Sequence, residues 1–293
     1  MTGEALALTA AAAFGITHFV AGLLARRVPG VTVALYTQVG GTVLAVLAAL
    51  VFTWGSPRPA DLAWGALSGA GSGLGVAFLY RAMSRGPLSV VVPLSDVGAV
   101  ALPVLLALAV VGDRPSPYGI AGIVLALPAI WLAASGPADS PDGDARGRAR
   151  AGRTSRLGRG SGDALLAGTG FALQFLALKP IPLDAGLWPI TAGRAASVAV
   201  ILPWVLAASG VPMRLPVRSA VPALAVGTLG SAAIALFWVA AHRELLAVAS
   251  VLAALYPVVP VVLALVVLRE RVTSRQAAGL AGAVAAIALL TVP

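Results

Sequence analysis

Long apolar runs alternate with short polar or charged breaks along the whole chain. A helix that crosses the hydrocarbon core of a bilayer needs roughly 20 mainly apolar residues. Ten runs meet this requirement, so we predict ten transmembrane helices. A transmembrane β-barrel is not expected, because the runs lack the alternation of polar and apolar residues that its strands show. The predicted spans are residues 4–25, 32–54, 61–82, 87–111, 117–135, 163–179, 186–208, 217–241, 245–268 and 274–292.

The longest hydrophilic segment, residues 136–162, separates the spans into two groups of five. It carries six arginines among Gly, Pro, Ser and Asp residues and has almost nothing apolar to bury. Burial therefore cannot offset the entropy lost on ordering, and we predict a mobile, solvated linker. An arginine run can also mark a nucleic-acid site. Its position between two membrane blocks favours a charged loop, so no nucleic-acid partner is expected.

The composition indicates an all-α integral membrane protein, which we expect in the cell membrane. Of the 293 residues, 59% are hydrophobic and only 11% are charged, whereas a soluble globular chain carries about 25% charged residues. The net charge of +9 comes largely from the linker and the short loops. That distribution fits contact with anionic lipid headgroups.

The positive charges also predict an orientation. Fifteen of the 20 Lys and Arg residues belong to the loops after the first, third, fifth, seventh and ninth spans. Positive loops tend to stay in the cytoplasm, so this count predicts a cytoplasmic linker and both termini outside. The first apolar run follows no positive segment and is too long for the core of a signal peptide. We therefore expect it to remain as a span.

The second group of spans repeats the first. A shift of 157 residues aligns residue types that rarely coincide by chance, namely Pro103 with Pro260, Asp113 with Glu270, Arg114 with Arg271 and Gly122 with Gly279. Because five is an odd number of crossings, the second repeat enters the membrane from the opposite side. We predict two inverted five-helix repeats, residues 1–135 and 163–293, a construction that recurs in secondary transporters.

Two short motifs in the second repeat are similar to a known family. The run Leu268-Arg269-Glu270-Arg271-Val272-Thr273, followed by Gly279, resembles the signature after the fourth span of an EamA repeat, in the drug/metabolite transporter superfamily. Tyr256-Pro257 is similar to that family too. The first repeat departs from the pattern, with Asp113 in place of Glu and Pro115 in place of a hydrophobic residue.

The resemblance covers both repeats, so nearly the whole chain except the linker. It implies a ten-helix carrier with a central cavity that moves small metabolites or drugs by alternating access. It also implies that both termini lie in the cytoplasm, the reverse of the orientation that the charge count predicts.

Few ionisable groups lie at bilayer depth, where each charge costs about 2.5–3.5 kcal/mol and usually faces a cavity. Asp96 and Arg194 lie near the middle of the fourth and seventh spans. They either form a structural pair or serve transport. In transport Asp96 would bind a proton or a cationic group, and Arg194 would keep Asp96 ionised or meet a substrate carboxylate. His18 is either a hydrogen-bonded interior residue or part of a proton path. Other candidates to line a substrate cavity are Gln38, Gln174, Trp238 and Tyr256.

Proline and glycine positions point to special helix geometry. Proline removes a backbone hydrogen bond, so we predict kinks in the fourth and ninth spans at Pro93, Pro103, Pro257 and Pro260. Matching kinks in two repeats either reflect packing or mark a transport site. In the third span, glycines at intervals of four allow close helix contact and serve packing alone or a substrate-lined surface; they are Gly65, Gly69 and Gly73.

The sequence contains no zinc-peptidase, serine-hydrolase or ATP-binding motif, no acidic and histidine cluster suited to a metal, and no cysteine. We therefore predict a secondary transporter that exports a small molecule, without cofactor, metal or catalytic residue, as a monomer or homodimer. The alternatives are a flippase for lipid-linked substrates, a lipid-modifying membrane enzyme and a non-transporting scaffold. A wet central cavity shared by Asp96 and Arg194 would favour transport. A polar cluster open sideways to lipid would favour the flippase or the enzyme. A dry, tightly packed centre would favour the scaffold.

Overall fold

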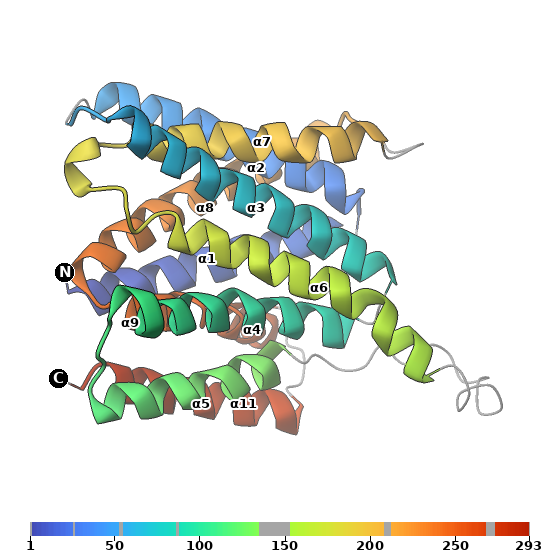
Figure 1. The fold of residues 1–293 in the computed structure, drawn as a ribbon. Coiled ribbons are helices and arrows are strands. Elements are labelled where there is room, and N and C mark those ends of the chain that lie inside the picture. The colour runs from blue at the N-terminus through green and yellow to red at the C-terminus, as the bar shows by residue number, and fades with distance from the viewer. Residues whose placement is uncertain are drawn as a thin grey trace.

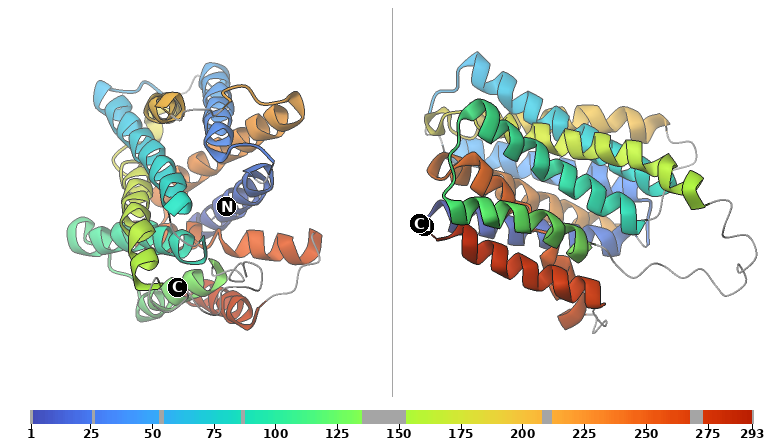
Figure 2. Two further views of the ribbon diagram at one scale, coloured as in Figure 1. Left: turned by 90° about the vertical axis from the view of Figure 1, so that its right-hand side faces the viewer. Right: turned by 60° about the horizontal axis from the view of Figure 1, so that its bottom comes forward.

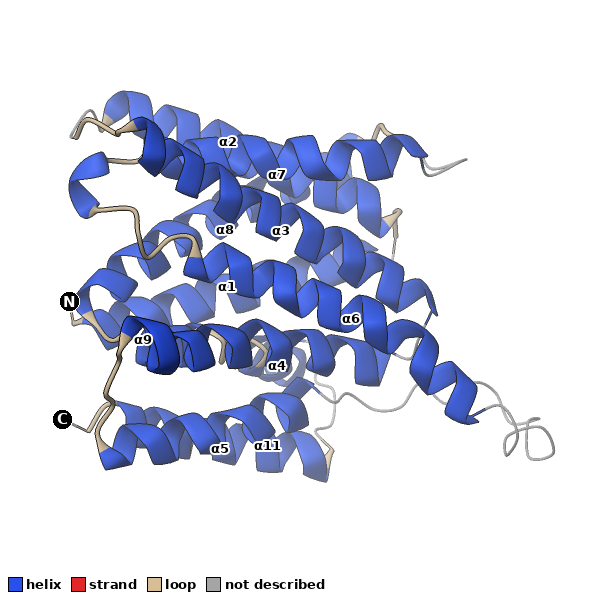
Figure 3. Cartoon of the chain, in the orientation of Figure 1, coloured by secondary structure: helices blue, strands red, loops and turns tan. Residues whose placement is uncertain are grey.

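The computed structural model describes residues 2–25, 27–52, 55–85, 88–134, 153–207, 212–267 and 273–292. Within these ranges the regular structure is helical throughout, and no strand is present (Figures 1 and 3). The helices are α1 Gly3–Ala25, α2 Gly30–Val51, α3 Pro59–Arg85, α4 Leu88–Leu106, α5 Pro117–Ala134, α6 Arg153–Leu176, α7 Trp188–Ala207, α8 Val217–Arg243, α9 Leu246–Ala253, α10 Val258–Val267 and α11 Ser274–Leu290.

Each predicted span coincides with one helix, except that the ninth corresponds to α9 and α10 together. Within the described ranges, six helices are long and apolar enough to cross a membrane: α1, α2, α3, α4 with its π-helical end, α7 and α8. Three shorter apolar segments accompany them, Pro117–Ala133, Leu246–Pro260 and Ser274–Leu290. The helical class predicted from the sequence is therefore confirmed, and these helices bundle side by side along one axis (Figure 1).

The predicted linker is shorter than expected. Residues 135–152 lie outside the described residues, but α6 begins at Arg153, ten residues before the expected span. Polarity indicates that a segment is not buried, but it does not prevent the backbone of a membrane helix from continuing beyond the hydrocarbon core. A helix satisfies its own amides wherever it runs, so the arginine-rich end of the segment joins α6.

The helix contacts of the two halves mirror each other. Helix α3 packs against α6 and α7, and α8 packs in the same way against α1 and α2. Helix α4 contacts α6, just as α9 and α10 contact α1. Helices α5 and α11 pair at one edge of the bundle (Figure 2). The helices of one half are therefore inserted between those of the other, as two interlocked repeats.

The pairing of α5 with α11 preserves the aligned glycines. A β-carbon at Gly122, near the start of α5, would lie 3.2 Å from the carbonyl oxygen of Ala286 near the end of α11. A β-carbon at Gly279, near the start of α11, would lie 2.9 Å from the carbonyl oxygen of Ala129 near the end of α5. The two helices are thus antiparallel, and equivalent glycines make equivalent contacts.

Helix α3 uses glycine on two faces. A β-carbon at Gly65 or Gly69 would overlap a backbone carbonyl of α7, that of Pro189 or Gly193. On the face toward α6, a β-carbon at Gly71 would lie 2.7 Å from the carbonyl oxygen of Gly170. Both helices therefore approach the backbone of α3 itself, a contact that only glycine allows.

The ninth span is interrupted. Helix α9 ends at Ala253, a turn covers residues 254–257, and α10 begins at Val258. Pro257 lies in that turn and has no N–H to continue the helix. The first helix accommodates the break at Gly15, where a β-carbon would lie 2.7 Å from the carbonyl oxygen of Tyr256. In the fourth span α4 stays continuous through Pro93 and Pro103 and ends in a π-helix, Ala107–Val111.

Asp113 connects the two repeats at the end of the bundle where both termini lie. Its Oδ2 accepts a hydrogen bond of 2.8 Å from the backbone N–H of Ala247, in the first turn of α9. A carboxylate is favourable there, because the first N–H groups of a helix have no intrahelical partner and carry partial positive charge. Glu270, its counterpart in the second repeat, lies outside the described residues, as does the rest of the run 268–272.

The outer surface of the bundle is apolar. Large hydrophobic side chains project from it, with 53% of Val43, 75% of Val110 and 64% of Val124 exposed. Water would disfavour so much exposed apolar surface, whereas the acyl chains of a bilayer accept it.

The glycine contact between α3 and α7 can be tested by substitution. We expect Gly69→Ala to lower the midpoint of thermal unfolding in detergent and the amount of folded protein, because the two backbones must separate. Overpacking of this kind costs about 1–3 kcal/mol. As a control, Gly162→Ala in α6 adds a β-carbon that has nothing within 4 Å and should be neutral or slightly stabilising. Equal midpoints for the two variants would contradict the contact.

Candidate functional site

A cavity of about 280 Å³ lies at the centre of the bundle. Its walls come from α1, α2, α3, α4, α6, α7, α8 and the turn between α9 and α10, so both repeats contribute. The apolar lining includes Phe14, Val33, Val76, Leu79, Phe171, Phe175, Val226 and Ile234, and the polar lining Thr17, His18, Thr37, Gln38, Ser72, Gln174, Arg194 and Tyr256. Five of the seven residues predicted to bind substrate therefore line one cavity.

The cavity extends toward one end of the bundle. Its lining includes Ala25 at the end of α1, Val33 near the start of α2 and Leu79 near the end of α3. These positions lie at the end of the bundle where α5 ends and α6 begins, which we call the linker face (Figure 1). At the other end, which carries both termini, the core is filled by fully buried side chains such as Phe237, Trp238 and Leu246.

Arg194 is a buried cation to which the described residues offer no ionic partner. The residue is 7% exposed, and its buried Nε has no hydrogen-bond partner in the described part of the chain. The guanidinium lies over the backbone of α2, where a β-carbon at Gly41 would overlap Nη2. No ion pair within the described residues includes it. Such a charge is costly at bilayer depth unless water or a ligand solvates it.

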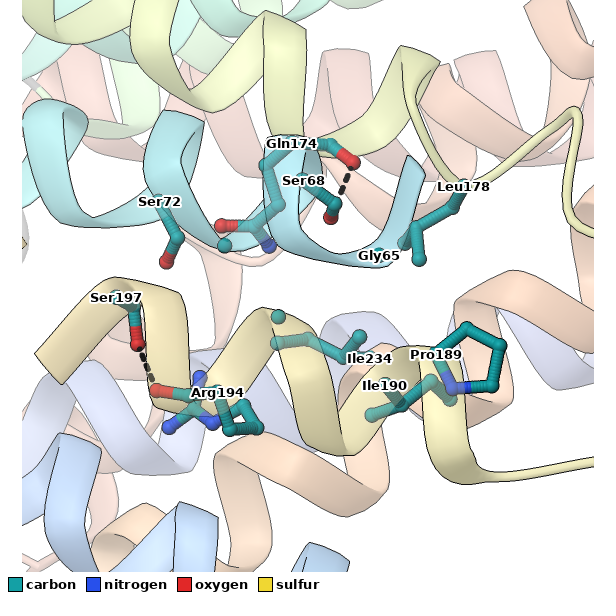
Figure 4. A pocket seen from close by; sticks show the side chains of 12 residues that line it. Gly65, Ser68, Ser72, Gln174, Leu178, Pro189, Ile190, Arg194, Ser197 and Ile234 are labelled. Carbon is teal, nitrogen blue, oxygen red and sulfur yellow. Dashed lines mark hydrogen bonds between the residues drawn. The ribbon is translucent and has the colours of Figure 1, made fainter. Parts of the chain in front are cut away.

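A second, much smaller pocket adjoins the cavity at Arg194. Its volume is about 10 Å³, room for about one water molecule. It shares Ser72, Gln174 and Arg194 with the large cavity. Figure 4 shows α3 and α6 on one side of this pocket and α7 on the other. The hydroxyl of Ser197 lies 2.8 Å from the carbonyl oxygen of Arg194 and 3.0 Å from Oε1 of Gln38.

The Ser197 hydroxyl has one hydrogen, so it donates either to the carbonyl oxygen of Arg194 or to Oε1 of Gln38. In either amide orientation, at least one N–H of Gln38 remains as a donor. The side chain is 5% exposed, and that of Gln174 is 6% exposed. Arg194, Gln38, Gln174 and Ser72 therefore form a group of polar side chains from four helices, which we call the arginine cluster.

Asp96, Tyr256 and His18 form a second polar group. The Tyr256 hydroxyl donates a hydrogen bond to Oδ1 of Asp96, and Oδ2 of Asp96 is buried with no hydrogen-bond partner among the described residues. The His18 ring stacks on the Tyr256 ring, with centroids 4.6 Å apart and planes inclined by 25°. His18 Nδ1 lies 2.6 Å from the carbonyl oxygen of Phe14. A carbonyl only accepts, so Nδ1 carries the hydrogen and Nε2 is left as an acceptor.

This group links the cavity to the broken ninth span. His18 and Tyr256 line the cavity, whereas Asp96 lies behind Tyr256 and is 3% exposed. The turn at Pro257 presents Tyr256 to both. We call these three residues the carboxylate cluster.

The sequence left open whether Asp96 and Arg194 form a structural pair or serve transport, and in this structure the pair does not form. Asp96 bonds to Tyr256 instead, and Arg194 belongs to the other polar cluster. The physical reason is that the phenol of Tyr256, brought close by the break in the ninth span, occupies one carboxylate oxygen.

Trp238 does not line the cavity. It is 2% exposed, lies in the packed core beyond the cavity, and donates a hydrogen bond of 2.9 Å from Nε1 to the carbonyl oxygen of Ile181. An indole needs one acceptor and a large apolar site, and both are supplied by the closed end of the bundle. Of the four prolines, Pro257 lies in the break, Pro260 in α10, and Pro93 and Pro103 in α4.

Several lining residues were not expected. Ser72, Thr17 and Thr37 are small polar residues in apolar helices, and nothing in their local sequence separates them from residues that bond to their own helix. Phe171 and Phe175 have the four-residue spacing of any buried helix face. Gln174 lies between them, and its depth in an apolar run was the available signal.

The fold and site together define a helical membrane protein of two repeats with a polar cavity at its centre. A family model for the EamA-like transporter family matches residues 1–135 and 160–292. The chain therefore belongs to the EamA-like transporter family, which is a family of transporters rather than enzymes. The family predicted from the sequence is thus confirmed, although most of the signature run after the ninth span lies outside the described residues.

Comparison with solved structures supports the fold alone. One crystal structure, described only as that of a protein, is similar to this chain with a TM-score of 0.74 and 18% sequence identity. The match covers 99% of this chain and 96% of the chain in that structure. No curated protein matches the sequence significantly.

The absence of an Asp96–Arg194 ion pair predicts additive effects. We expect Asp96→Asn and Arg194→Gln each to leave folded protein, because neither strands an ionic partner. The double variant should shift the free energy of unfolding by the sum of the single shifts, within about 0.5 kcal/mol. Thermal unfolding in detergent measures all three variants. Strong rescue of Asp96→Asn by Arg194→Gln would show that the two charges pair after all.

Proposed function

We propose that the protein is a secondary transporter that exports a small organic molecule through the central cavity by alternating access, as a monomer or homodimer in the cell membrane. The observation that carries the proposal is a cavity whose walls come from both repeats and which extends to one face while the other end is packed. That is the shape of a carrier open on one side. A counterflow screen of labelled metabolites in proteoliposomes tests it directly. A screen in which the protein exchanges none of the compounds would count against it.

We also propose that the chain crosses the membrane ten times as two inverted five-helix repeats. The mirrored contacts of α3 and α8 support this reading, and so does the antiparallel pairing of α5 with α11. The two repeats can then rock against each other around the cavity, and exchange of their conformations would open the opposite face.

The alternatives fit the cavity less well. A flippase or lipid-modifying enzyme needs a polar cluster open sideways to lipid, whereas here the polar groups lie between helices of both repeats. A scaffold needs a dry, filled centre, and 280 Å³ is close to the lower end of the volumes of small-molecule sites.

The carboxylate cluster supports coupling to a proton gradient. An acidic side chain at bilayer depth is costly when charged, and protonation removes that cost. One oxygen of Asp96 accepts no hydrogen bond from the described residues, and Tyr256 and His18 connect this carboxylate to the cavity. A proton taken up at Asp96 in one orientation and released in the other would drive transport against a substrate gradient.

We expect Asp96→Asn to keep folded protein and counterflow exchange but to lose accumulation driven by a pH gradient, down to the level of protein-free vesicles. Its transport should also depend less on pH, because the amide cannot titrate. The measurement is uptake into proteoliposomes, with and without an imposed pH gradient, of a substrate that the wild type exchanges. Asp184→Asn, an exposed carboxylate outside the cavity, is the matched control and should behave as wild type. Unaltered gradient-driven uptake in Asp96→Asn would overturn the role of this residue.

We propose further that the linker face lies in the cytoplasm, in line with the positive loops. A cavity open to that face would admit substrate from the cell interior, as export requires. A reporter enzyme that is active only outside the cell, fused after Pro293, should then be active. Activity of a cytoplasmic reporter at the same position would reverse the orientation, as the family resemblance implies.

A further inference from the structure

The arginine cluster has the composition of an anion site. Among the described residues that line the cavity, Arg194 is the one that carries a permanent charge, and none is Asp or Glu. A single cation in a low-dielectric, apolar-walled cavity attracts anions strongly, because little solvent screens it.

The donors around Arg194 are still available to a ligand. Its Nε has no partner, and no hydrogen bond or ion pair joins its guanidinium to another described residue. The amide of Gln38 contacts Ser197, and in either amide orientation at least one of its N–H groups remains available to a ligand. The planar guanidinium fork matches an oxyanion with two oxygens, such as a carboxylate.

The charge balance narrows the ligand further. One arginine neutralises one negative charge, so a dianion such as a phosphate monoester would leave excess negative charge buried. The rest of the wall is apolar, with Phe14, Phe171 and Phe175 from two helices of opposite repeats. A ligand that fills this cavity needs a charged end and an apolar body.

We propose that the substrate is a small amphipathic organic monoanion whose carboxylate, or equivalent singly charged oxyanion, binds Arg194 with Gln38 and Gln174. This inference rests on the proposed transport function and names the substrate class of the same cavity. Arg194 provides the charge and the fork, and the amides add neutral donors. The aromatic residues contact the apolar body.

Binding can be tested without transport. The probes are 3-phenylpropionate, its neutral analogue 3-phenylpropanamide and the dianion 3-phenylpropyl phosphate, added to the full chain in detergent. A ligand that binds only the folded state raises the unfolding midpoint, and at a given ligand concentration the rise grows with the logarithm of its affinity. We expect 3-phenylpropionate to stabilise the wild type. The amide should bind at least roughly tenfold more weakly because it loses the charge-assisted contact. The phosphate should also bind at least roughly tenfold more weakly, because its second negative charge would be buried without a partner.

Substitutions assign the effect to Arg194. Arg194→Gln should weaken 3-phenylpropionate roughly 10- to 100-fold and leave the amide unchanged, and Arg194→Lys should be intermediate because it keeps the charge but loses the fork. Arg218→Gln removes an exposed arginine at the start of α8 and should bind as wild type. If Arg194→Gln does not fold, Gly41→Ala serves instead, since its methyl group would displace the guanidinium. It should weaken the anion alone.

The outcomes separate this inference from the proposed function. Equal stabilisation by the amide and the anion, unchanged anion binding in both Arg194→Gln and Gly41→Ala, or no stabilisation by 3-phenylpropionate would overturn the anion site. Counterflow of p-toluenesulfonate, which stays ionised and does not cross lipid unaided, tests transport separately. Binding without counterflow would contradict transport but keep the site. Neutral or cationic solutes could instead show equal counterflow in the wild type and in Arg194→Gln. That result would support the transport function but overturn the proposal that the substrate is an anion.

Discussion

Close backbone contact between α3 and the second repeat determines the rest of the structure. Gly65 and Gly69 let α7 approach, and Gly71 lets α6 approach, so three helices meet at van der Waals distance. In a bilayer no hydrophobic force drives helices together, and such dispersion contact between small residues takes its place. The same approach brings Ser72, Gln174 and Arg194 into one cluster. Packing and site are therefore consequences of one contact.

The part of the cavity near His18 and Tyr256 depends on the break in the ninth span. Pro257 ends the ninth span as a regular helix, and the resulting turn carries Tyr256 to the Asp96 carboxylate. A break at this depth is tolerated because protein and a cavity surround it, instead of lipid. Gly15 of α1 makes room for the turn. Asp113 supports the half-helix that precedes it, since its carboxylate accepts from the first turn of α9. The two repeats thus stabilise each other's irregular segments.

The sequence predicted the helices well because length and apolarity alone select a membrane helix. In the described residues each predicted run contains helical structure, the ninth as two helices, and α6 begins ten residues before its predicted span. An arginine-rich helix end looks the same as a loop in composition. Gln38, Gln174 and Arg194 were also identified as candidate site residues, because each lies deep within an apolar run. Their grouping around one pocket needed the register of four helices, which periodicity in uniformly apolar runs does not reveal. For the same reason the sequence could not decide whether Asp96 pairs with Arg194, because the phenol that contacts Asp96 comes from a turn 160 residues away. Trp238 was misjudged because an indole in an apolar run fits a cavity wall and a core equally well.

The central claim is that water reaches the middle of this bundle through a cavity between the repeats, and that lipid covers the outside. The chain has no native cysteine, so single cysteines can report it directly. Thr37 lines the cavity, and Val43 is 53% exposed on the outer side of the same helix. The measurement is the rate at which a membrane-impermeant maleimide modifies Thr37→Cys and Val43→Cys in oriented vesicles, with reagent on either side. Alternating access predicts modification of Thr37→Cys from both sides and of Val43→Cys from neither. An inert Thr37→Cys, or equal rates at the two positions, would contradict the account.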